Sequence, residues 1–214
     1  MTKPICVDLF CGLGGWAQGF LAEGYDVVGF DIERHDYGTG GYPGQLILQD
    51  VLTLHGSQFK DAACIVASPP CQAYSYRDMP WKRAKALPPP DNSLFEACFR
   101  IQREASEASG RYIPLVVENV RGAQKWVGVA KRKFGSIYLW GDIPALLPIG
   151  KHIKEPVDPR NRTKMGGWFY DNYETSHRRF SSHSKKRKAW SAQIAKIPFP
   201  LARHIARTYK PVAP

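Results

Sequence analysis

An apolar run at residues 5–10 that breaks at once into glycines constrains the fold more than any other feature. The run reads Ile-Cys-Val-Asp-Leu-Phe, which is the length and composition of a strand covered on both faces. Gly12, Gly14 and Gly15 follow it, and apolar residues then continue at helical spacing over residues 15–23. A buried strand that turns on glycines into a helix indicates an α/β fold with a parallel sheet.

Further apolar runs repeat this pattern along the chain. They predict strands at residues 26–31, 46–48, 64–67, 112–117 and 137–140, and an amphipathic helix at residues 93–109. Alternating strands and helices imply parallel strands with right-handed crossovers, and ligands bind beyond the carboxyl ends of such strands. The residues expected to meet at that edge are Gly12, Asp31, Asp50, Cys71 and Glu118.

The length of 214 residues and the apolar fraction of 43% fit one domain with a small appendage. We expect residues 1–148 to form the α/β core. Residues 149–190 show little periodicity and are expected to be an irregular basic insertion. Helical spacing returns in residues 191–214, interrupted by Pro198 and Pro200, and this helix is expected to pack back on the core.

The formal charge of +11 is concentrated in one stretch. Between Lys151 and Trp190 there are eleven Lys or Arg residues against four Asp or Glu, so this stretch carries +7 of the total. Such a surface suits a polyanion such as nucleic acid, although a charge run alone equally fits a solvated face.

The five cysteines are odd in number and form no C-x-x-C pair. A disulfide framework or a zinc site is therefore not expected, and no metal is assigned. The sequence contains no apolar run long enough to span a membrane and does not begin like a signal peptide. We expect a cytoplasmic protein that does not bind membranes.

The glycine segment and two acidic residues together suggest a nucleoside-bearing cofactor. The glycines let a ligand approach the backbone, and the helix N-terminus behind them offers unpaired N–H groups, although a glycine cluster alone equally fits a tight turn. Asp31 ends the next strand, where an acidic residue would hold ribose hydroxyls. Asp50 ends the third strand and is placed to accept from an exocyclic amine.

Cys71 is a candidate nucleophile. A single cysteine is more often an inert buried residue, but Cys71 is expected on a loop at the carboxyl edge of the sheet, between Pro70 and Gln72. A nucleophilic cysteine needs thiolate character, and we expect the basic residues Arg77, Lys82 and Arg83 to lower its pKa.

Glu118 and Asn119 follow two valines at the end of an expected strand. They fit either a capping pair at a strand-to-loop turn or a catalytic carboxylate with its neighbour. Because 47 residues separate Glu118 from Cys71, only the fold can bring the two together.

Three segments, in this order, resemble the motifs of the cytosine-C5 DNA methyltransferases: Asp8-Leu-Phe-Cys-Gly-Leu-Gly-Gly15, Pro69-Pro-Cys-Gln-Ala-Tyr-Ser75 and Glu118-Asn-Val120. The resemblance spans residues 4–147 and implies a methyltransferase domain with a Rossmann-like sheet. Such a domain uses S-adenosyl-L-methionine and releases S-adenosyl-L-homocysteine. By position it implies that the cofactor is bound by Asp8, Phe10, Gly12, Leu13, Gly14, Asp31, Ile32, Asp50, Val51 and Pro70.

The resemblance also implies a mechanism. The Cys71 thiolate would add to C6 of a cytosine that is flipped out of DNA, and Glu118 would bind N3 and the 4-amino group. The implied catalytic residues are Cys71, Gln72, Glu118, Asn119 and Arg162. The residues expected to bind nucleic acid are Ser75, Tyr76, Arg77, Lys82, Arg83, Arg178, Arg179, Lys185, Lys186 and Arg187.

The sequence departs from the family in three places. It has no clear glutamine-arginine-arginine motif, and Arg160 and Arg162 are the candidate replacements. The asparagine of the family's last motif is absent. The recognition region is reduced to residues 149–190, as in short phage-borne members, and phosphate contacts from a basic segment carry no sequence information. Loose or very short sequence specificity is therefore predicted.

The leading hypothesis is a monomeric DNA cytosine-C5 methyltransferase of a bacterial or phage-infected cell, with DNA as its partner. One alternative is methyl transfer to RNA cytosine or to free cytosine nucleotides, and the stretch of charge +7 argues against free nucleotides. Another is a catalytically silent module that binds cofactor and nucleic acid. A third is an altered sulfonium donor that delivers a group other than methyl.

Overall fold

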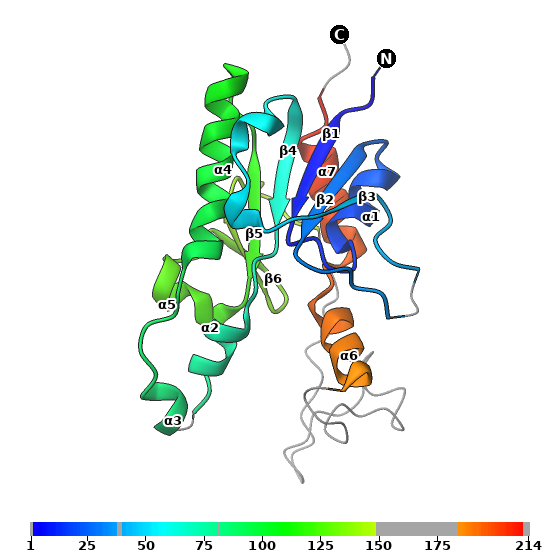
Figure 1. The fold of residues 1–214 in the computed structure, drawn as a ribbon. Coiled ribbons are helices and arrows are strands. Elements are labelled where there is room, and N and C mark those ends of the chain that lie inside the picture. Colours follow the sequence, from blue (N-terminus) through cyan, green and yellow to red (C-terminus); the bar gives the residue numbers. More distant parts are fainter. Residues whose placement is uncertain (1, 38–39, 81, 149–183, 212–214) are drawn as a thin grey trace.

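The computed structural model describes residues 2–37, 40–80, 82–148 and 184–211. Within these residues a seven-stranded sheet has the order β3-β2-β1-β4-β5-β7-β6, with helices on both faces (Figure 1). The α/β fold class predicted from the sequence is confirmed. The strands are β1 (Ile5–Leu9), β2 (Asp26–Asp31), β3 (Gln45–Leu48), β4 (Ala62–Ala67), β5 (Leu115–Asn119), β6 (Arg132–Phe134) and β7 (Ile137–Gly141).

The first five strands are parallel, and β7 runs antiparallel to both β5 and β6. The prediction of parallel strands is therefore wrong for β7. A tight hairpin at Gly135, whose φ of 61° suits glycine, reverses the chain where a crossover helix was expected. Strand β6 was not predicted at all, because its three residues Arg-Lys-Phe form no apolar run.

The helices divide between the two faces of the sheet. Helix α4 (Ser93–Ser109), whose bounds match the prediction, covers one face, and α1 (Gly15–Ala22) and α7 (Phe199–Thr208) cover the other (Figure 1). The remaining helices are α2 (Gln72–Arg77), α3 (Lys82–Lys85), α5 (Gln124–Val127) and α6 (Lys185–Ala195), with short 3₁₀ turns η1 (Val51–Thr53), η2 (Gly56–Phe59) and η3 (Arg121–Ala123).

Neighbouring residues of the central strands supply the two cores. In β1, Val7 packs into the core beneath α4, whereas Cys6 packs into the core beneath α1 and α7. All six residues of β4 are buried, as expected for a strand covered on both faces. Packing on both faces of the sheet therefore holds the strand ends in place.

The C-terminal helix packs directly on α1. A Cβ added at Gly19 would lie 2.4 Å from the backbone nitrogen of Arg203, so the two helices approach as closely as glycine allows. The Tyr25 hydroxyl donates to the carbonyl of Ala206 at 2.9 Å, and Glu23 pairs with Arg203 and Arg207. This contact ties residues near the C-terminus to the first βα unit.

The segment before α7 differs from the prediction of an irregular insertion over residues 149–190. Residues Lys185–Ala195 form helix α6, because this stretch lacks glycine and proline and contains several good helix formers. Residues 149–183 of the expected insertion lie outside the described residues.

Candidate functional site at the carboxyl edge of the sheet

The carboxyl ends of β1 to β5 lie at one edge because these five strands are parallel. The strand order reverses between β1 and β4, and such a switch point is where open α/β sheets bind ligands. The candidate residues that follow or end these strands are Gly12, Asp31, Asp50, Cys71 and Glu118. The predicted meeting of these positions at one edge is confirmed by the topology.

The turn after β1 is built from left-handed backbone. Phe10, Gly12 and Gly14 have φ values of 57°, 50° and 70°, and such a value is uncommon for a residue with a side chain. A Cβ at Gly14 would lie 2.3 Å from Pro43, whereas a Cβ at Gly12 would meet no atom within 4 Å. Gly14 is thus required by packing, and the backbone at Gly12 is open to a ligand.

Asp31 connects this turn to the end of β2. Its Oδ2 accepts from the Gly12 N–H at 2.9 Å, and its Oδ1 accepts from the Ile32 N–H at 2.8 Å and lies 3.3 Å from His35 Nε2. Burial acts to raise the pKa of Asp31, but the hydrogen bonds from His35 and Gly12 outweigh it, so the pKa lies below its usual range. The carboxylate is therefore ionised at neutral pH. The contact with His35 was not predicted from the sequence.

Asp8, which lies in β1 just before the turn, is buried within the protein. Its side chain is 0% exposed, and Oδ2 accepts from the Tyr42 hydroxyl at 3.0 Å. Burial raises the pKa of Asp8 well above its usual range. Among the described residues, Oδ1 has no hydrogen-bond partner. Asp8 thus carries an unsatisfied buried oxygen directly behind the glycine turn.

The other residues predicted to bind cofactor vary in their exposure. Ile32 is 74% exposed beside Asp31, but Val51 is 2% exposed and packs within the core beneath α4. Leu13 is buried and Pro70 is exposed. Asp50 caps η1 by accepting from the Leu52 N–H at 2.9 Å. The open backbone at Gly12, the ionised Asp31 and the exposed Ile32 fit an adenosine-bearing ligand best.

Cys71 directly precedes α2 and is partly buried. Burial raises the pKa of its thiol, a hydrogen bond with Ser75 acts to lower it, and the nearby Glu118 raises it further. The expectation that basic residues lower this pKa is wrong. The Arg77 guanidinium instead donates to the carbonyls of Pro88 and Ala73, each at 2.8 Å. The resting form of Cys71 is the thiol.

Glu118 lies near the end of β5 and has a perturbed pKa. Burial raises the pKa of Glu118 to about 7, and a hydrogen bond with the Ser68 side chain opposes this effect. Ser68 Oγ also accepts from Trp16 Nε1 at 3.0 Å. Ser68 therefore links the start of α1 to the carboxyl group of β5. Sequence reasoning missed this role, although Ser68 stands at the end of β4, next to the double proline.

Asn119 positions the segment that carries Cys71. It is 0% exposed, its Nδ2 donates to the carbonyl of Pro69 at 2.9 Å, and its Oδ1 accepts from the Val120 N–H at 2.8 Å. Both functions of the amide are thus used within the protein. Gln72, in contrast, is exposed.

The segment from α2 to α3 is anchored at its start. The Tyr74 hydroxyl donates to Asn92 Oδ1 at 3.0 Å, and a Cβ at Gly122 would lie 2.9 Å from the Tyr74 carbonyl. Tyr76 is 38% exposed, Lys82 and Arg83 are exposed, and Ser75 is partly buried. Exposed residues predicted to bind nucleic acid thus lie close to Cys71 in the chain.

The remaining predicted residues fall near or beyond the limits of the described chain. Arg162, Arg178 and Arg179 lie outside the described residues, and so does Arg160. Lys185, Lys186 and Arg187 lie at the start of α6, and Lys185 is exposed.

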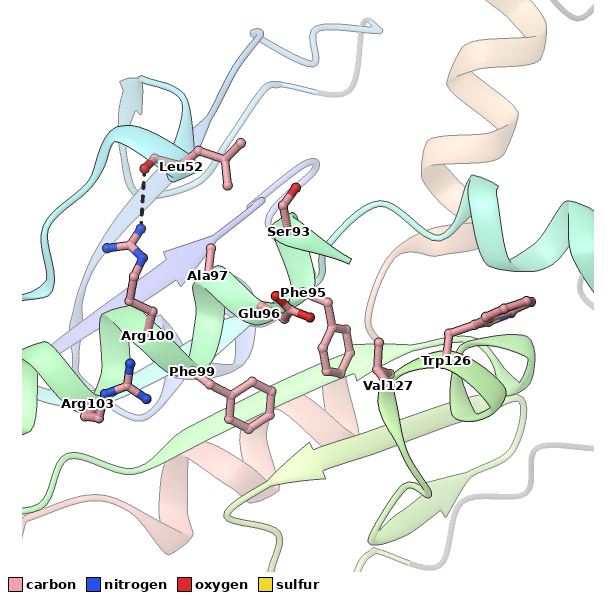
Figure 2. Close-up of a pocket in the computed structure, with 10 residues that line it drawn as sticks. All are labelled: Leu52, Ser93, Phe95, Glu96, Ala97, Phe99, Arg100, Arg103, Trp126 and Val127. Carbon is pink, nitrogen blue, oxygen red and sulfur yellow. Dashed lines mark hydrogen bonds between the residues drawn. The ribbon is translucent and has the colours of Figure 1, made fainter. Parts of the chain in front are cut away.

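A pocket of about 790 Å³ lies beside this edge and contains none of the predicted site residues (Figure 2). It runs along α4 between Leu52 of η1 and Trp126 of α5. Arg100 in its lining is held by the Leu52 carbonyl at 3.4 Å, and pairs with Glu104 at 3.0 Å. The guanidinium of Arg100 is therefore satisfied within the protein. In the part of the chain that the structure describes, no helix is long and apolar enough to cross a membrane.

Solved structures that match part of this chain include three methyltransferases, and the match spans less than half of the length of each. A protein described as a DNA modification methyltransferase from an E. coli prophage is 23% identical, with a TM-score of 0.39, over 59% of this chain and 35% of its own. Dnmt2 of S. pombe is 16% identical, with a TM-score of 0.40, over 59% and 37%. The methyltransferase EhMeth of Entamoeba histolytica is 14% identical, with a TM-score of 0.40, over 60% and 41%.

No curated protein matches the chain significantly. A family model does match: that of the C-5 cytosine-specific DNA methylases, over residues 5–126. The matched region contains the glycine turn, Asp31, Asp50, Cys71 and Glu118. Because the match covers more than half of the 214 residues, the chain belongs to the C-5 cytosine-specific DNA methylase family.

Proposed function

We propose that this protein is a DNA cytosine-5 methyltransferase that forms a covalent adduct between Cys71 and the target base. The observation that carries the proposal is that Glu118 acts electrostatically on Cys71 at the sheet edge. Cys71 directly precedes α2 and Glu118 lies in β5, and both groups have raised pKa values. Strongly perturbed groups that meet beside a switch point are typical of catalytic sites.

S-adenosyl-L-methionine, when bound, supplies the methyl group as an electrophile. In the proposal the open backbone at Gly12 and the neighbouring Phe10 and Leu13 hold its methionine and adenosine parts. The ionised Asp31 accepts from the ribose hydroxyls, and Asp50 accepts from the adenine amine. Ile32 packs on the adenine ring, since its side chain is exposed beside Asp31.

The first chemical step joins Cys71 to the base. The Cys71 thiol loses its proton to water, and the thiolate sulfur forms a bond to C6 of cytosine. The electron pair of the C5–C6 double bond moves through the ring, and N3 takes a proton from Glu118. Because the pKa of Glu118 is about 7, a large fraction of this carboxyl group carries a proton at neutral pH.

Glu118 in its neutral form also favours the thiolate. A carboxylate at this position raises the pKa of Cys71, so protonation of Glu118 removes that electrostatic opposition. A neutral Glu118 thus serves both partners of the step: it gives N3 its proton and leaves the sulfur easier to ionise.

The last step releases the enzyme. Once C5 carries the methyl group, the hydrogen on C5 leaves as a proton to water. The bond between C6 and the Cys71 sulfur then breaks, and the C5–C6 double bond forms again, which restores the aromatic ring. N3 returns its proton to the Glu118 carboxylate. Asn119 holds the Pro69 carbonyl throughout and so positions the segment that carries Cys71.

The target base has to leave the stack for this chemistry, because C6 cannot be reached within a duplex. In the proposal, the exposed residues Tyr76, Lys82 and Arg83 contact the strand around the extruded base. Loose sequence specificity remains part of the proposal, with residues 149–190 as the reduced recognition region.

Nucleoside mass spectrometry tests the proposed function. DNA and RNA are each incubated with the protein and S-adenosyl-L-methionine, then digested to nucleosides. We expect 5-methyl-2′-deoxycytidine from DNA, none from the Cys71→Ala variant, and product from the control variant Cys98→Ala, which removes a thiol within α4. Unmodified DNA despite demonstrated cofactor binding, methylation of RNA alone, or product from Cys71→Ala would contradict the proposal.

A further inference from the structure

We propose that four exposed cations, Lys125, Lys131, Arg132 and Lys133, form a surface that binds the phosphate backbone of duplex DNA next to the target base. We call these four residues the basic strip. The inference rests on the proposed function and adds to it a DNA-binding surface outside residues 149–190.

The charge of this region is one-sided. Between Glu118 and Asp142 the chain carries five Lys or Arg residues and no Asp or Glu. Arg121 lies 3.7 Å from Asp78, which leaves the four cations of the basic strip. All four are exposed, and none forms an ion pair with a carboxylate of the described residues.

Some exposed cations elsewhere in the described chain are neutralised by carboxylates. Lys3 pairs with Asp26 at 3.5 Å and Lys60 with Asp61 at 3.0 Å, and Arg207 pairs with Glu23 at 2.8 Å. The basic strip therefore presents charge that its surroundings do not neutralise. A polyanion is the partner that such a surface fits.

The strand register places the basic strip beside the proposed catalytic carboxyl group. Glu118 pairs with Leu139 of β7, and Leu139 pairs with Arg132 of β6. In the next row, Asn119 pairs with Tyr138 and Tyr138 with Lys133. Adjacent strands are about 4.8 Å apart, so the two rows of cations lie roughly 10 Å from β5.

This separation suits the backbone around a flipped nucleotide. Successive nucleotides of one strand advance about 3.4 Å along the duplex axis, so roughly 10 Å corresponds to phosphates about three nucleotides from the target. Residues paired across a sheet also project from the same face. Arg132 thus lies on the face toward which Glu118 projects, whereas Lys133 lies on the opposite face with Asn119. Both cations border the sheet edge that β6 forms.

Lys125 extends the basic strip toward the segment that follows Cys71. A pocket of about 410 Å³ is lined by Arg77 and Lys85 on one side and by Lys125 and Trp126 on the other. Asp78 is the acidic residue of this lining and pairs with Arg121. The Lys125 ammonium lies 4.6 Å from the centre of the Trp126 ring. Cations of α3 and α5 therefore line the same pocket, and β6 follows α5 in the chain.

Protection of a sheet edge is the alternative explanation. Strand β6 is an edge strand, and lysines on such strands prevent pairing with other molecules. This explanation accounts for Arg132 and Lys133 but not for Lys125, which lies on helix α5. Lys125 therefore distinguishes the two explanations.

The test compares two triple variants of the full chain. One is Lys131→Gln, Arg132→Gln, Lys133→Gln; its control, Lys3→Gln, Lys60→Gln, Arg103→Gln, removes three exposed cations elsewhere. Fluorescence anisotropy measures binding to a cytosine-containing DNA duplex over a series of salt concentrations. Each phosphate contact contributes about 0.9 to the magnitude of the slope of log K against log salt concentration. The magnitude of this slope should therefore fall by about 2 to 3 in the strip variant and by about 0 in the control.

Lys125→Gln is measured in the same way and should reduce the slope by about 1. An unchanged slope for either strip variant overturns the inference, as does an equal loss in the control. Self-association of the triple variant with unchanged DNA binding would assign the cations to edge protection. Tighter binding to an RNA duplex of the same sequence would overturn DNA as the partner.

Two further readouts separate this inference from the proposed function. Calorimetric binding of S-adenosyl-L-methionine should be equal in both triple variants, which shows that the fold is intact. A slope that depends on the basic strip without 5-methylcytosine formation by the wild type would support the strip and contradict the proposed function. Methylation by the wild type, together with a salt slope that the strip substitutions leave unchanged, would support the proposed function and contradict the basic strip.

Discussion

The ionisation of Cys71 depends on that of Glu118, because both side chains are partly buried at one edge of the sheet and Glu118 acts electrostatically on Cys71. Burial opposes charge on each group, and the two negative forms also oppose each other. The state in which Glu118 keeps its proton while Cys71 loses one is the state that the proposed chemistry requires. This dependence makes the pH profile of the enzyme a direct readout of the site.

Replacement of Glu118 by Gln should remove one limb of that profile. The pKa of Glu118 is about 7, so the protonated fraction, and with it kcat/KM, should fall as the pH rises through 7. A Gln side chain does not titrate and gives no proton to N3, so kcat/KM should drop roughly 10²-fold or more and lose this limb. The matched control is Glu107→Gln, at an exposed glutamate of α4. A Glu118→Gln enzyme of wild-type rate and profile would contradict the assigned role.

Ser68→Ala should move the same limb to higher pH. The hydrogen bond with Ser68 lowers the pKa of Glu118, and its loss leaves burial unopposed. The readout is the midpoint of the limb in kcat/KM, which a merely structural role of Ser68 would not shift. A fall in rate at every pH with an unchanged midpoint would count against this assignment.

The residues at the site were predictable to the extent that they follow strand ends. Asp31, Cys71 and Glu118 could be assigned to one edge because the carboxyl ends of parallel strands meet there. Their partners were not predictable: His35 contacts Asp31 through the local path of the loop after β2. The direction of the Cys71 pKa shift was predicted wrongly, because sequence proximity does not reveal that Arg77 points to backbone carbonyls.

At the scale of elements, the close contact between α1 and α7 holds the glycine turn against the sheet. Gly15 and Gly19 face α7 and the residues before it, and an added Cβ at either position would lie 2.4 Å from backbone nitrogen. The contact connects the two ends of the described chain across one face of the sheet. It is therefore a structural requirement for the turn that begins at the end of β1.

Gly19→Ala should destabilise the protein despite the better helix propensity of alanine. The propensity gain is about 1 kcal/mol, but overlap with the backbone of Arg203 and Ala202 forces the helices apart, so we expect a net loss of about 1–3 kcal/mol in unfolding free energy. Urea unfolding measures the loss. Gln18→Ala, at an exposed position of the same helix, is the control and should be close to neutral. Equal stability of the two variants would rule out a tight contact.

Long apolar or amphipathic elements were predicted well, and short polar ones were not. The bounds of β2 and α4 match the sequence pattern because each has a continuous apolar face and clear ends. Strand β6 is set by pairing with β7 and not by its own residues, and the antiparallel direction of β7 follows from that hairpin. Helix α6 was obscured because its cations suggested a solvated, irregular segment.

At the scale of the whole molecule, one sheet edge gathers all the chemistry of the proposal. The family match covers residues 5–126, whereas the basic strip extends to residue 133 and α7 lies near the other end of the chain. In the proposal, the core thus supplies the cofactor turn, the nucleophile, the carboxyl group and part of the expected DNA surface. The central claim is that Cys71 becomes bonded to cytosine in DNA.

Covalent trapping tests this claim most directly. A DNA duplex that contains 5-fluoro-2′-deoxycytidine is incubated with the protein and S-adenosyl-L-methionine. Fluorine cannot leave C5 as a proton does, so the bond between C6 and sulfur should persist. We expect a protein–DNA complex in the intact mass spectrum, a linkage that maps to Cys71, and no complex with Cys71→Ala. A linkage at another residue, or no complex while ordinary DNA is methylated, would contradict the account.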